Sequence, residues 1–335
     1  MENKTVLLTG GAGFIGAHIT EHILKTTDWN IIILDRLSYA GNLNRLTDIN
    51  IWWDNKHRVK FYYHDFKSHF NDGKIQQLLQ LFGNIDYIIH NGANSHVDKS
   101  IQDPYPFVFD NVLGTVNMLE LCKQLESLDK FIYISTDETF GPAIDRLHKE
   151  DDPHKPSNPY SASKASGEDF CVAYYNTYNL PIIITNTMNI IGERQDSEKF
   201  VPKTLKSILN NEEVLIHCRK DNKGNILDVS SRYWLHARNQ ADGLTWLLEN
   251  GTLGEKYNIV GERLDCYELA KKIANIVDKP LIVRFEDFHS FRPGHDMHYG
   301  LDGSKLEQLG WVPPYSLDNT LEKTIRWMIN NPQWL

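Results

Sequence analysis

Short apolar runs alternate with helical patterns along the first half of the chain. Six runs rich in β-branched or aromatic residues predict strands, at residues 5–9, 31–34, 59–63, 86–90, 130–135 and 181–185. Apolar positions at helical spacing lie between most of them, as at Ile75, Leu78 and Leu79. Near-continuous apolar strands separated by helices are typical of a parallel sheet covered on both faces. The pattern predicts an α/β fold with a Rossmann-type, doubly wound parallel sheet.

The pattern becomes irregular after about Thr187. Helical signals return at residues 237–249, 267–277 and 317–329. We expect residues 1–187 to form one domain, to which a segment at about 229–250 returns. Residues 188–335 are expected to form a smaller C-terminal lobe that closes over the carboxyl edge of the sheet and binds the substrate.

The segment TGGAGFIG, Thr9 to Gly16, follows the first predicted strand and opens the first helix. Its glycines fit both the GxGxxG and the GxxGxxG spacing. Such a loop permits a tight turn and lets the backbone approach a pyrophosphate at a helix N-terminus. We therefore predict contacts to a dinucleotide from Gly10, Gly13, Phe14, Ile15 and Gly16.

Two acidic residues after later strands refine the expected cofactor. Asp35 ends the second strand, where a carboxylate binds the adenosine ribose hydroxyls and repels a 2′-phosphate. This position favours NAD over NADP, although the neighbouring Arg36 argues in the opposite direction. Asp65, after the third strand, is expected near the adenine, and a solvated loop residue is an equally good interpretation.

Composition and charge exclude several classes of function. The 335 residues are 41% hydrophobic and 24% charged, as in ordinary globular proteins. The net charge of −9 and the lack of a basic stripe argue against nucleic acid or anionic membrane as a partner. The four cysteines form no CxxC pair, so we expect no metal site, no disulfide scaffold and a reducing, cytoplasmic location.

The segment YISTDETFG places three polar residues directly after a strand-forming run. Thr136, Asp137 and Glu138 would be costly to bury without a function. They form a solvated turn or, if they line a pocket, an acid and a base side by side.

Tyr160 and Lys164 share one face if the segment NPYSASKASGEDF is helical. An ammonium group near a phenol favours the phenolate, so we expect Lys164 to lower the pKa of Tyr160 from its usual value of about 10. Tyr160 would then act as a general base that takes a proton from an alcohol while a hydride leaves to NAD.

These segments together resemble the extended short-chain dehydrogenases/reductases, and within them the nucleotide-sugar 4,6-dehydratases typified by dTDP-glucose 4,6-dehydratase. The resemblance runs nearly end to end and includes TGGAGFIG, LDRLSYAGN, NSHVDKSI, NVLGTVNMLE, STDETFG, YSASKA, SRYWLHARNQADG and RPGHDMHY. STDETFG and RPGHD narrow it to dehydratases.

The resemblance implies a homodimer that converts a nucleotide-diphosphate hexose to its 4-keto-6-deoxy form. Tyr160 would be the base during oxidation at carbon 4, with Thr136 on the carbon 4 oxygen and Lys164 beside it. Glu138 would remove the proton on carbon 5, and Asp137 would protonate the departing carbon 6 hydroxyl before hydride returns to carbon 6. Adjacent carboxylates suit these roles because their environments can push their pKa values apart.

The resemblance also implies a set of substrate contacts, namely Asn94, Ser95, His96, Asn189, Lys199, Arg232, Arg292 and Tyr299. Asn94 replaces a Glu of many relatives, which hints at an altered substituent such as an acetamido group. TMNIIGERQ replaces the more usual NNYG run, and Met297 and His298 stand where arginines are common. The base, UDP or dTDP, the sugar, glucose or N-acetylglucosamine, and the configuration of carbon 5 in the product stay open.

Two other functions fit parts of the pattern. A nucleotide-sugar 4-epimerase would use Tyr160, Lys164 and NAD but has no need of the two carboxylates. A non-catalytic sensor of dinucleotides or nucleotide sugars should lack catalytic residues, which are present here. The dehydratase is therefore the favoured hypothesis.

Overall fold

A computed structural model describes residues 3–287 and 297–335 of the chain. Its centre is a seven-stranded sheet in the order β11-β6-β5-β4-β1-β2-β3, in which every neighbouring pair is parallel. The strands are β1 (Thr5–Thr9), β2 (Asn30–Asp35), β3 (Val59–Tyr63), β4 (Tyr87–His90), β5 (Lys130–Thr136), β6 (Ile182–Thr187) and β11 (Lys256–Ile259). The first six coincide with the predicted apolar runs to within one or two residues.

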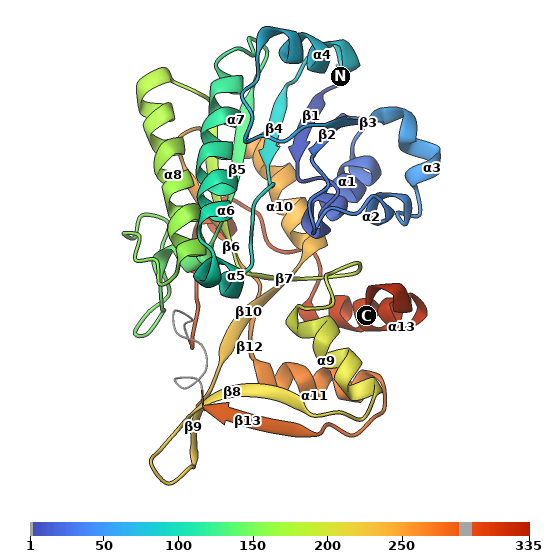
Figure 1. Ribbon diagram of the computed structural model, residues 1–335, viewed down its shortest axis with the longest axis vertical. Helices are drawn as coiled ribbons and strands as arrows, with labels where there is room; N and C mark the ends of the chain where they lie inside the picture. Colours follow the sequence, from blue (N-terminus) through green and yellow to red (C-terminus); the bar gives the residue numbers. More distant parts are fainter. Residues whose placement is uncertain (1–2, 288–296) are drawn as a thin grey trace.

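Helices cover both faces of this sheet, as the sequence pattern predicts (Figure 1). One face packs against α1 (Phe14–Thr26) and α10 (Ala237–Asn250). The other packs against α4 (Asp72–Phe82), α7 (Gly114–Cys122) and α8 (Pro159–Tyr178). The strand order reverses between β1 and β4, which is where doubly wound folds bind ligands at the carboxyl ends of the strands. The predicted fold class is confirmed.

The second lobe contains more strand than the sequence indicates. One three-stranded sheet has the order β12-β10-β7 and a second has the order β13-β8-β9. Their strands are β7 (Asn189–Ile191), β8 (Val214–Lys220), β9 (Ile226–Val229), β10 (Ser231–His236), β12 (Glu262–Asp265) and β13 (Val283–Asp287). The helices α9 (Phe200–Leu209), α11 (Cys266–Ile276) and α13 (Leu317–Asn330) complete its core.

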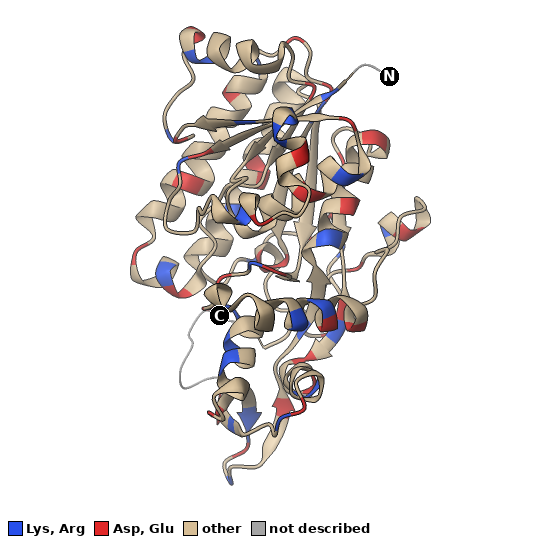
Figure 2. Cartoon of the chain, turned by 90° about the vertical axis from the view of Figure 1, so that its right-hand side faces the viewer, with Lys and Arg blue, Asp and Glu red and all other residues tan. Residues whose placement is uncertain are grey.

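Short helices make up the connections. They are α2 (Asn44–Thr47), α3 (Trp52–Asn55), η1 (Lys56–Arg58), α5 (Val97–Gln102), α6 (Tyr105–Phe107), the π-helix η2 (Val108–Leu113), η3 (Asp137–Phe140), α12 (Ser304–Gln308) and η5 (Pro332–Trp334). Acidic and basic residues are interspersed over both lobes in the side view of Figure 2. In the described part of the chain, every helix is too short or too polar to cross a bilayer.

The chain returns twice from the second lobe to the large sheet. Helix α10 packs along α1, and β11 then pairs with β6 as the last strand of the sheet. The sequence pattern indicates a return at about 229–250 but gives no signal for residues 256–259. Because β11 is four residues long, its apolar run is too short to stand out from the loops around it.

Candidate active site

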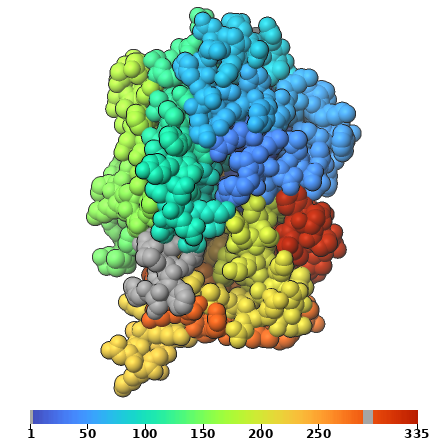
Figure 3. All heavy atoms as spheres, viewed as in Figure 1, coloured from blue at the N-terminus to red at the C-terminus, as the bar shows by residue number. Residues whose placement is uncertain are grey.

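A cleft of ≈ 350 Å³ lies between the large sheet and the second lobe. Its walls come from the carboxyl ends of β1, β2, β4, β5 and β6, and from β7, α9 and β10 on the opposite side. The space-filling view shows the surface hollowed beside the yellow segment around residue 200 (Figure 3). Both predicted halves of the site, glycine loop and acidic pair, therefore open into one cleft.

The glycine loop shapes one end of this cleft. Gly10 has a φ of +66°, and its N–H donates to the Leu34 carbonyl at 2.9 Å, which makes the tight turn after β1. A Cβ on Gly16 would lie 2.2 Å from the Gly10 carbonyl oxygen, so only glycine lets α1 begin this close to the turn. Gly13 caps α1 without a side-chain hydrogen bond, so the helix N-terminus faces the cleft. This cradle fits a dinucleotide pyrophosphate.

The predicted cofactor residues fall into two groups. Gly10, Gly13, Phe14, Ile15 and Asp35 line the cleft, whereas Gly16 packs under the loop. Asp35 accepts hydrogen bonds from the backbone N–H groups of Ala12 at 3.0 Å and Leu37 at 2.8 Å, so its position is fixed at the end of β2.

Asp65 does not line the cleft, and its neighbour Phe66 does. The carboxylate of Asp65 accepts from the Arg36 guanidinium at 3.2 Å and from the Lys67 N–H at 3.1 Å. The carboxylate is thus paired with Arg36, and the adenine contact expected of Asp65 stays a prediction.

The acidic pair lies where β5 runs into η3. The Thr136 hydroxyl donates to Oδ1 of Asp137 at 3.0 Å, and the Asn158 amide donates to Oε2 of Glu138 at 3.2 Å. Within the described residues, Oδ2 of Asp137 is buried without a hydrogen-bond partner. Burial and the neighbouring charge of Glu138 raise the pKa of Asp137 to about 7. The pKa of Asp137 thus lies near neutral pH, whereas Glu138 is only half-buried.

Helix α8 presents Tyr160 and Lys164 to the same cleft. The helix begins firmly because Asn158 and Ser161 form a capping box and Pro159 occupies its first turn. Asn111 also holds the helix, since its amide donates to Ser163 at 2.9 Å. The first turn of α8 is therefore rigidly placed beside the end of β5.

The pKa of Tyr160 is raised, which corrects the expectation that Lys164 lowers it. Burial is the largest cause, followed by the charge of Glu138, while a hydrogen bond with Thr136 opposes the shift. The Lys164 ammonium donates to the Ile134 carbonyl at 2.7 Å and lies 4.0 Å from the centre of the Tyr133 ring. The i, i+4 spacing predicts a shared helix face, but the ammonium group donates its hydrogen bond to β5, the strand beneath that face.

A buried carboxylate one turn further along α8 connects these elements. Glu168 accepts hydrogen bonds from Ser135 at 2.5 Å, Asn186 at 2.8 Å, and His154 and Lys256 at 3.1 Å each. These partners tie α8 to β5, β6 and β11. Burial lowers the pKa of Lys164 to about 8, and the charge of Glu168 opposes this shift.

We expect Glu168→Ala to lower the free energy of unfolding by about 3–5 kcal/mol, because the variant leaves the Lys256 charge and the buried Ser135 hydroxyl without this partner and removes one hydrogen bond of Asn186. Urea unfolding followed by circular dichroism measures the change. Asp169→Ala is the control, since this neighbour on α8 is largely exposed and should cost less than about 1 kcal/mol. Equal losses in the two variants would contradict the structural role of Glu168.

Some of the predicted substrate residues line the cleft and others do not. Asn94, Ser95, Asn189 and Lys199 line the cleft. His96 caps α5 instead and lies 3.7 Å from Glu198. Arg292 lies outside the described residues.

Arg232 and Tyr299 lie next to each other outside the cleft lining. The Arg232 guanidinium is 4.6 Å from the centre of the Tyr299 ring and donates to the Met297 carbonyl at 2.6 Å. Arg232 is still close enough to Asp137 for its charge to lower the pKa of that carboxyl group. Its influence on the site is therefore electrostatic in this structure.

Sequence reasoning missed several side chains of the cleft wall. They are Ser38, Phe66, Asn91, Asp110, Ser135, Met188, Gln195, Asp196, Phe200, Val201 and Trp234. Most are apolar or belong to the second lobe, where no motif marks them. Ser135 precedes the polar run at the end of β5, and that adjacency is the one local signal that could have found it.

Comparison with known proteins shows which family the chain belongs to. The family model for GDP-mannose 4,6 dehydratase matches residues 7–324. The chain is also 36% identical to the dTDP-glucose 4,6-dehydratase of Escherichia coli, over 98% of this chain and 94% of that protein. The chain belongs to the nucleotide-sugar 4,6-dehydratase family. The predicted family and enzyme class are thereby confirmed.

Solved structures of this family and of related enzymes have the same fold. A dTDP-glucose 4,6-dehydratase from Streptomyces venezuelae, crystallised with NAD bound, matches 98% of both chains with a TM-score of 0.85 and 31% identity. A UDP-glucose 4-epimerase from Thermus thermophilus, in complex with NAD, matches 97% of this chain and 99% of that one with a TM-score of 0.81 and 26% identity. These structures support the predicted NAD cofactor, while the family match distinguishes dehydratases from epimerases.

Proposed function

We propose that the chain catalyses the NAD-dependent 4,6-dehydration of dTDP-glucose to the 4-keto-6-deoxy sugar. The observation that carries the proposal is the carboxyl pair at the end of β5. Asp137 is buried with a pKa of about 7, Glu138 is half-buried beside it, and both line the cleft together with Tyr160. Elimination of water is assisted by a protonated acid and a base, and the different burial of these two carboxyl groups suits those roles.

The roles follow from where each group lies. Tyr160 would accept the proton of the carbon 4 hydroxyl, and Thr136, which shares a hydrogen bond with it, would hold the same oxygen. Glu138 would remove the proton on carbon 5. Asp137 would give its proton to the departing hydroxyl on carbon 6. Lys164 would keep a positive charge beneath the cofactor site.

The residues at the glycine loop fit NAD. The N-terminus of α1 faces the cleft without a capping side chain, and Asp35 closes the end at which an adenosine ribose would lie. Bound NAD would accept the hydride from carbon 4 and return it to carbon 6. The protein would keep the cofactor in place between these two events.

Asn94 bears on the choice of sugar. Its amide donates to the Asp110 carboxylate and, at 3.5 Å, to the Pro106 carbonyl. The amide nitrogen is thus engaged within the protein, which weakens the case for an altered substituent such as an acetamido group at carbon 2 or 3. Curated relatives named dTDP-glucose 4,6-dehydratase point to glucose and dTDP as well.

Proton NMR in deuterated water tests the proposal, with dTDP-glucose, UDP-glucose and UDP-N-acetylglucosamine in separate samples. We expect a new methyl signal and deuterium at carbon 5 with dTDP-glucose. Interconversion at carbon 4 without a methyl signal would favour the epimerase, and no change with any sugar would favour the sensor. The couplings of the product also report the configuration of carbon 5.

The elimination rate is expected to fall as pH rises through about 7. Burial and the charge of Glu138 raise the pKa of Asp137 to about 7, so its carboxyl group carries a proton below that pH and loses it above. Because the group acts as an acid, the rate should fall about tenfold per pH unit on the alkaline side. Single-turnover measurements from about pH 6 to about pH 9 check this, and a flat profile would contradict the role of Asp137.

We further propose a homodimer in which the exposed apolar side chains of α6, η2 and α8 pair with a second copy. Those side chains are Tyr105, Val108, Phe109, Leu113, Phe170 and Val172.

Residues 1–187 with 229–250 would bind the cofactor, and residues 188–335 the nucleotide sugar. The four cysteines, which are free and buried, support a reducing compartment.

A further inference from the structure

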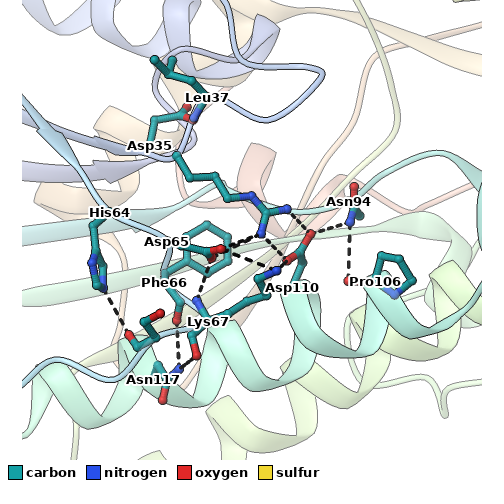
Figure 4. A network of polar contacts seen from close by, with 12 residues as sticks. Asp35, Leu37, His64, Asp65, Phe66, Lys67, Asn94, Pro106, Asp110 and Asn117 are labelled. Carbon is teal, nitrogen blue, oxygen red and sulfur yellow. Dashed lines mark hydrogen bonds and ion pairs between the residues drawn. The ribbon is translucent and has the colours of Figure 1, made fainter.

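Arg36, the residue after Asp35, favours a different cofactor from the one that Asp35 favours. A carboxylate at the end of the second strand favours NAD, whereas an arginine beside it is suited to the extra phosphate of NADP. In the structure, Arg36 lines the cleft but its guanidinium is already bound. It donates to both oxygens of Asp110, at 2.8 and 2.6 Å, and to both oxygens of Asp65 at 3.2 Å (Figure 4).

Asp110 holds Arg36 in a well-fixed position. Its side chain is 3% exposed and makes the two parallel hydrogen bonds that suit a guanidinium fork. Asp110 lies on the π-helix η2, and the Asn94 amide also donates to its carboxylate. The next residue, Asn111, bonds the Asn94 backbone in both directions at 2.8 and 2.9 Å. These contacts fix the backbone on both sides of the pair, and the carboxylate of Asp110 would lose the Asn94 and Arg36 hydrogen bonds if it turned away.

The charges around Arg36 leave no positive excess. Asp35, Asp65 and Asp110 carry three negative charges, against two positive charges on Arg36 and Lys67. A 2′-phosphate would bring about −1.5 to −2 further charges to this edge of the cleft. Without a guanidinium to receive it, the phosphate would meet a net negative surface.

We propose that Asp110, with Asp65, withholds Arg36 from the 2′-phosphate and so makes the cleft select NAD over NADP. Asp35 alone explains why a ribose with two hydroxyls is accepted. The pairing explains why the adjacent arginine does not extend the choice to the phosphorylated cofactor. Asp110 is thus a specificity-determining residue that acts through Arg36.

The test is displacement of NADH from the full-length protein by NADP⁺, followed through the fluorescence of the reduced nicotinamide. Asp110→Asn keeps the size of the side chain and removes its charge. We expect it to bind NADP⁺ about tenfold more tightly than the unchanged protein, since the released guanidinium can form a charge-assisted pair with the 2′-phosphate. Affinity for NAD should change less than about threefold.

Two further variants separate the mechanism from a general charge effect. Adding Arg36→Leu to Asp110→Asn should abolish the gain, because the phosphate then has no guanidinium to bind. Asp72→Asn is the matched control, since it removes one exposed negative charge on α4 without contacting Arg36.

Two outcomes would overturn the proposal. One is an Asp110→Asn protein that still binds NAD yet shows no gain for NADP⁺. The other is a gain that persists without Arg36. If Asp110→Asn does not fold, Asp65→Asn replaces it, because that carboxylate is one-third exposed, and about a threefold gain is then expected.

Discussion

Tyr160→Phe is expected to lower kcat/KM by about 10²–10⁴-fold while leaving the fold and cofactor binding unchanged. The substitution removes one hydroxyl group, which shares a hydrogen bond with Thr136 in the cleft. The ring itself stays packed edge-on against Phe107, with 6.3 Å between ring centres. Without the phenol, no group at this position takes the proton of the carbon 4 hydroxyl, so oxidation fails. Steady-state kinetics and the absence of reduced-cofactor absorbance after substrate is added measure the loss.

Tyr174→Phe provides the control on the same helix. Its hydroxyl donates to Glu120 at 2.6 Å, away from the cleft, so its loss should change kcat/KM less than about twofold. If Tyr160→Phe kept more than about a tenth of the activity, the base would have to be another group. Because burial raises the pKa of Tyr160, the prediction also requires that bound ligands make the phenol easier to ionise.

The sequence predicts the large sheet well because its signals are local. Strands such as β1 and β2 have continuous apolar centres and are nearly fully buried, and the glycine loop and polar run follow strands directly. The second lobe lacks such signals. Its strands β9 and β12 expose half of their residues and contain charged side chains, so they resemble loops.

Charge pairing is the part of the site that sequence cannot supply. Arg36 and Asp110 are 74 positions apart, and only the fold brings them together. The same holds for Lys164, which shares a helix face with Tyr160 but gives its hydrogen bond to a strand carbonyl. The pKa of a buried group depends on such distant neighbours and on desolvation, so spacing along a helix predicts proximity and not protonation.

Glu138→Gln is expected to stop the elimination while allowing oxidation at carbon 4. The amide keeps the size of the side chain and can still contact Asn158, but it cannot accept a proton from carbon 5. We expect the dehydration rate to fall by about 10²–10⁴-fold. Because oxidation continues, reduced cofactor should build up during the first turnover, which absorbance in a stopped-flow experiment detects.

Asp137→Asn distinguishes the base from the acid within the same pair. In that variant Glu138 can still remove the carbon 5 proton, so substrate recovered from deuterated water should carry deuterium at carbon 5 without having lost water. Glu138→Gln should give substrate without deuterium at that carbon. Equal deuterium content in the two variants would mean that the assignment of base and acid is wrong. Burial and the charge of Glu138 raise the pKa of Asp137, so Glu138→Gln should also shift the ionisation of its neighbour to lower pH.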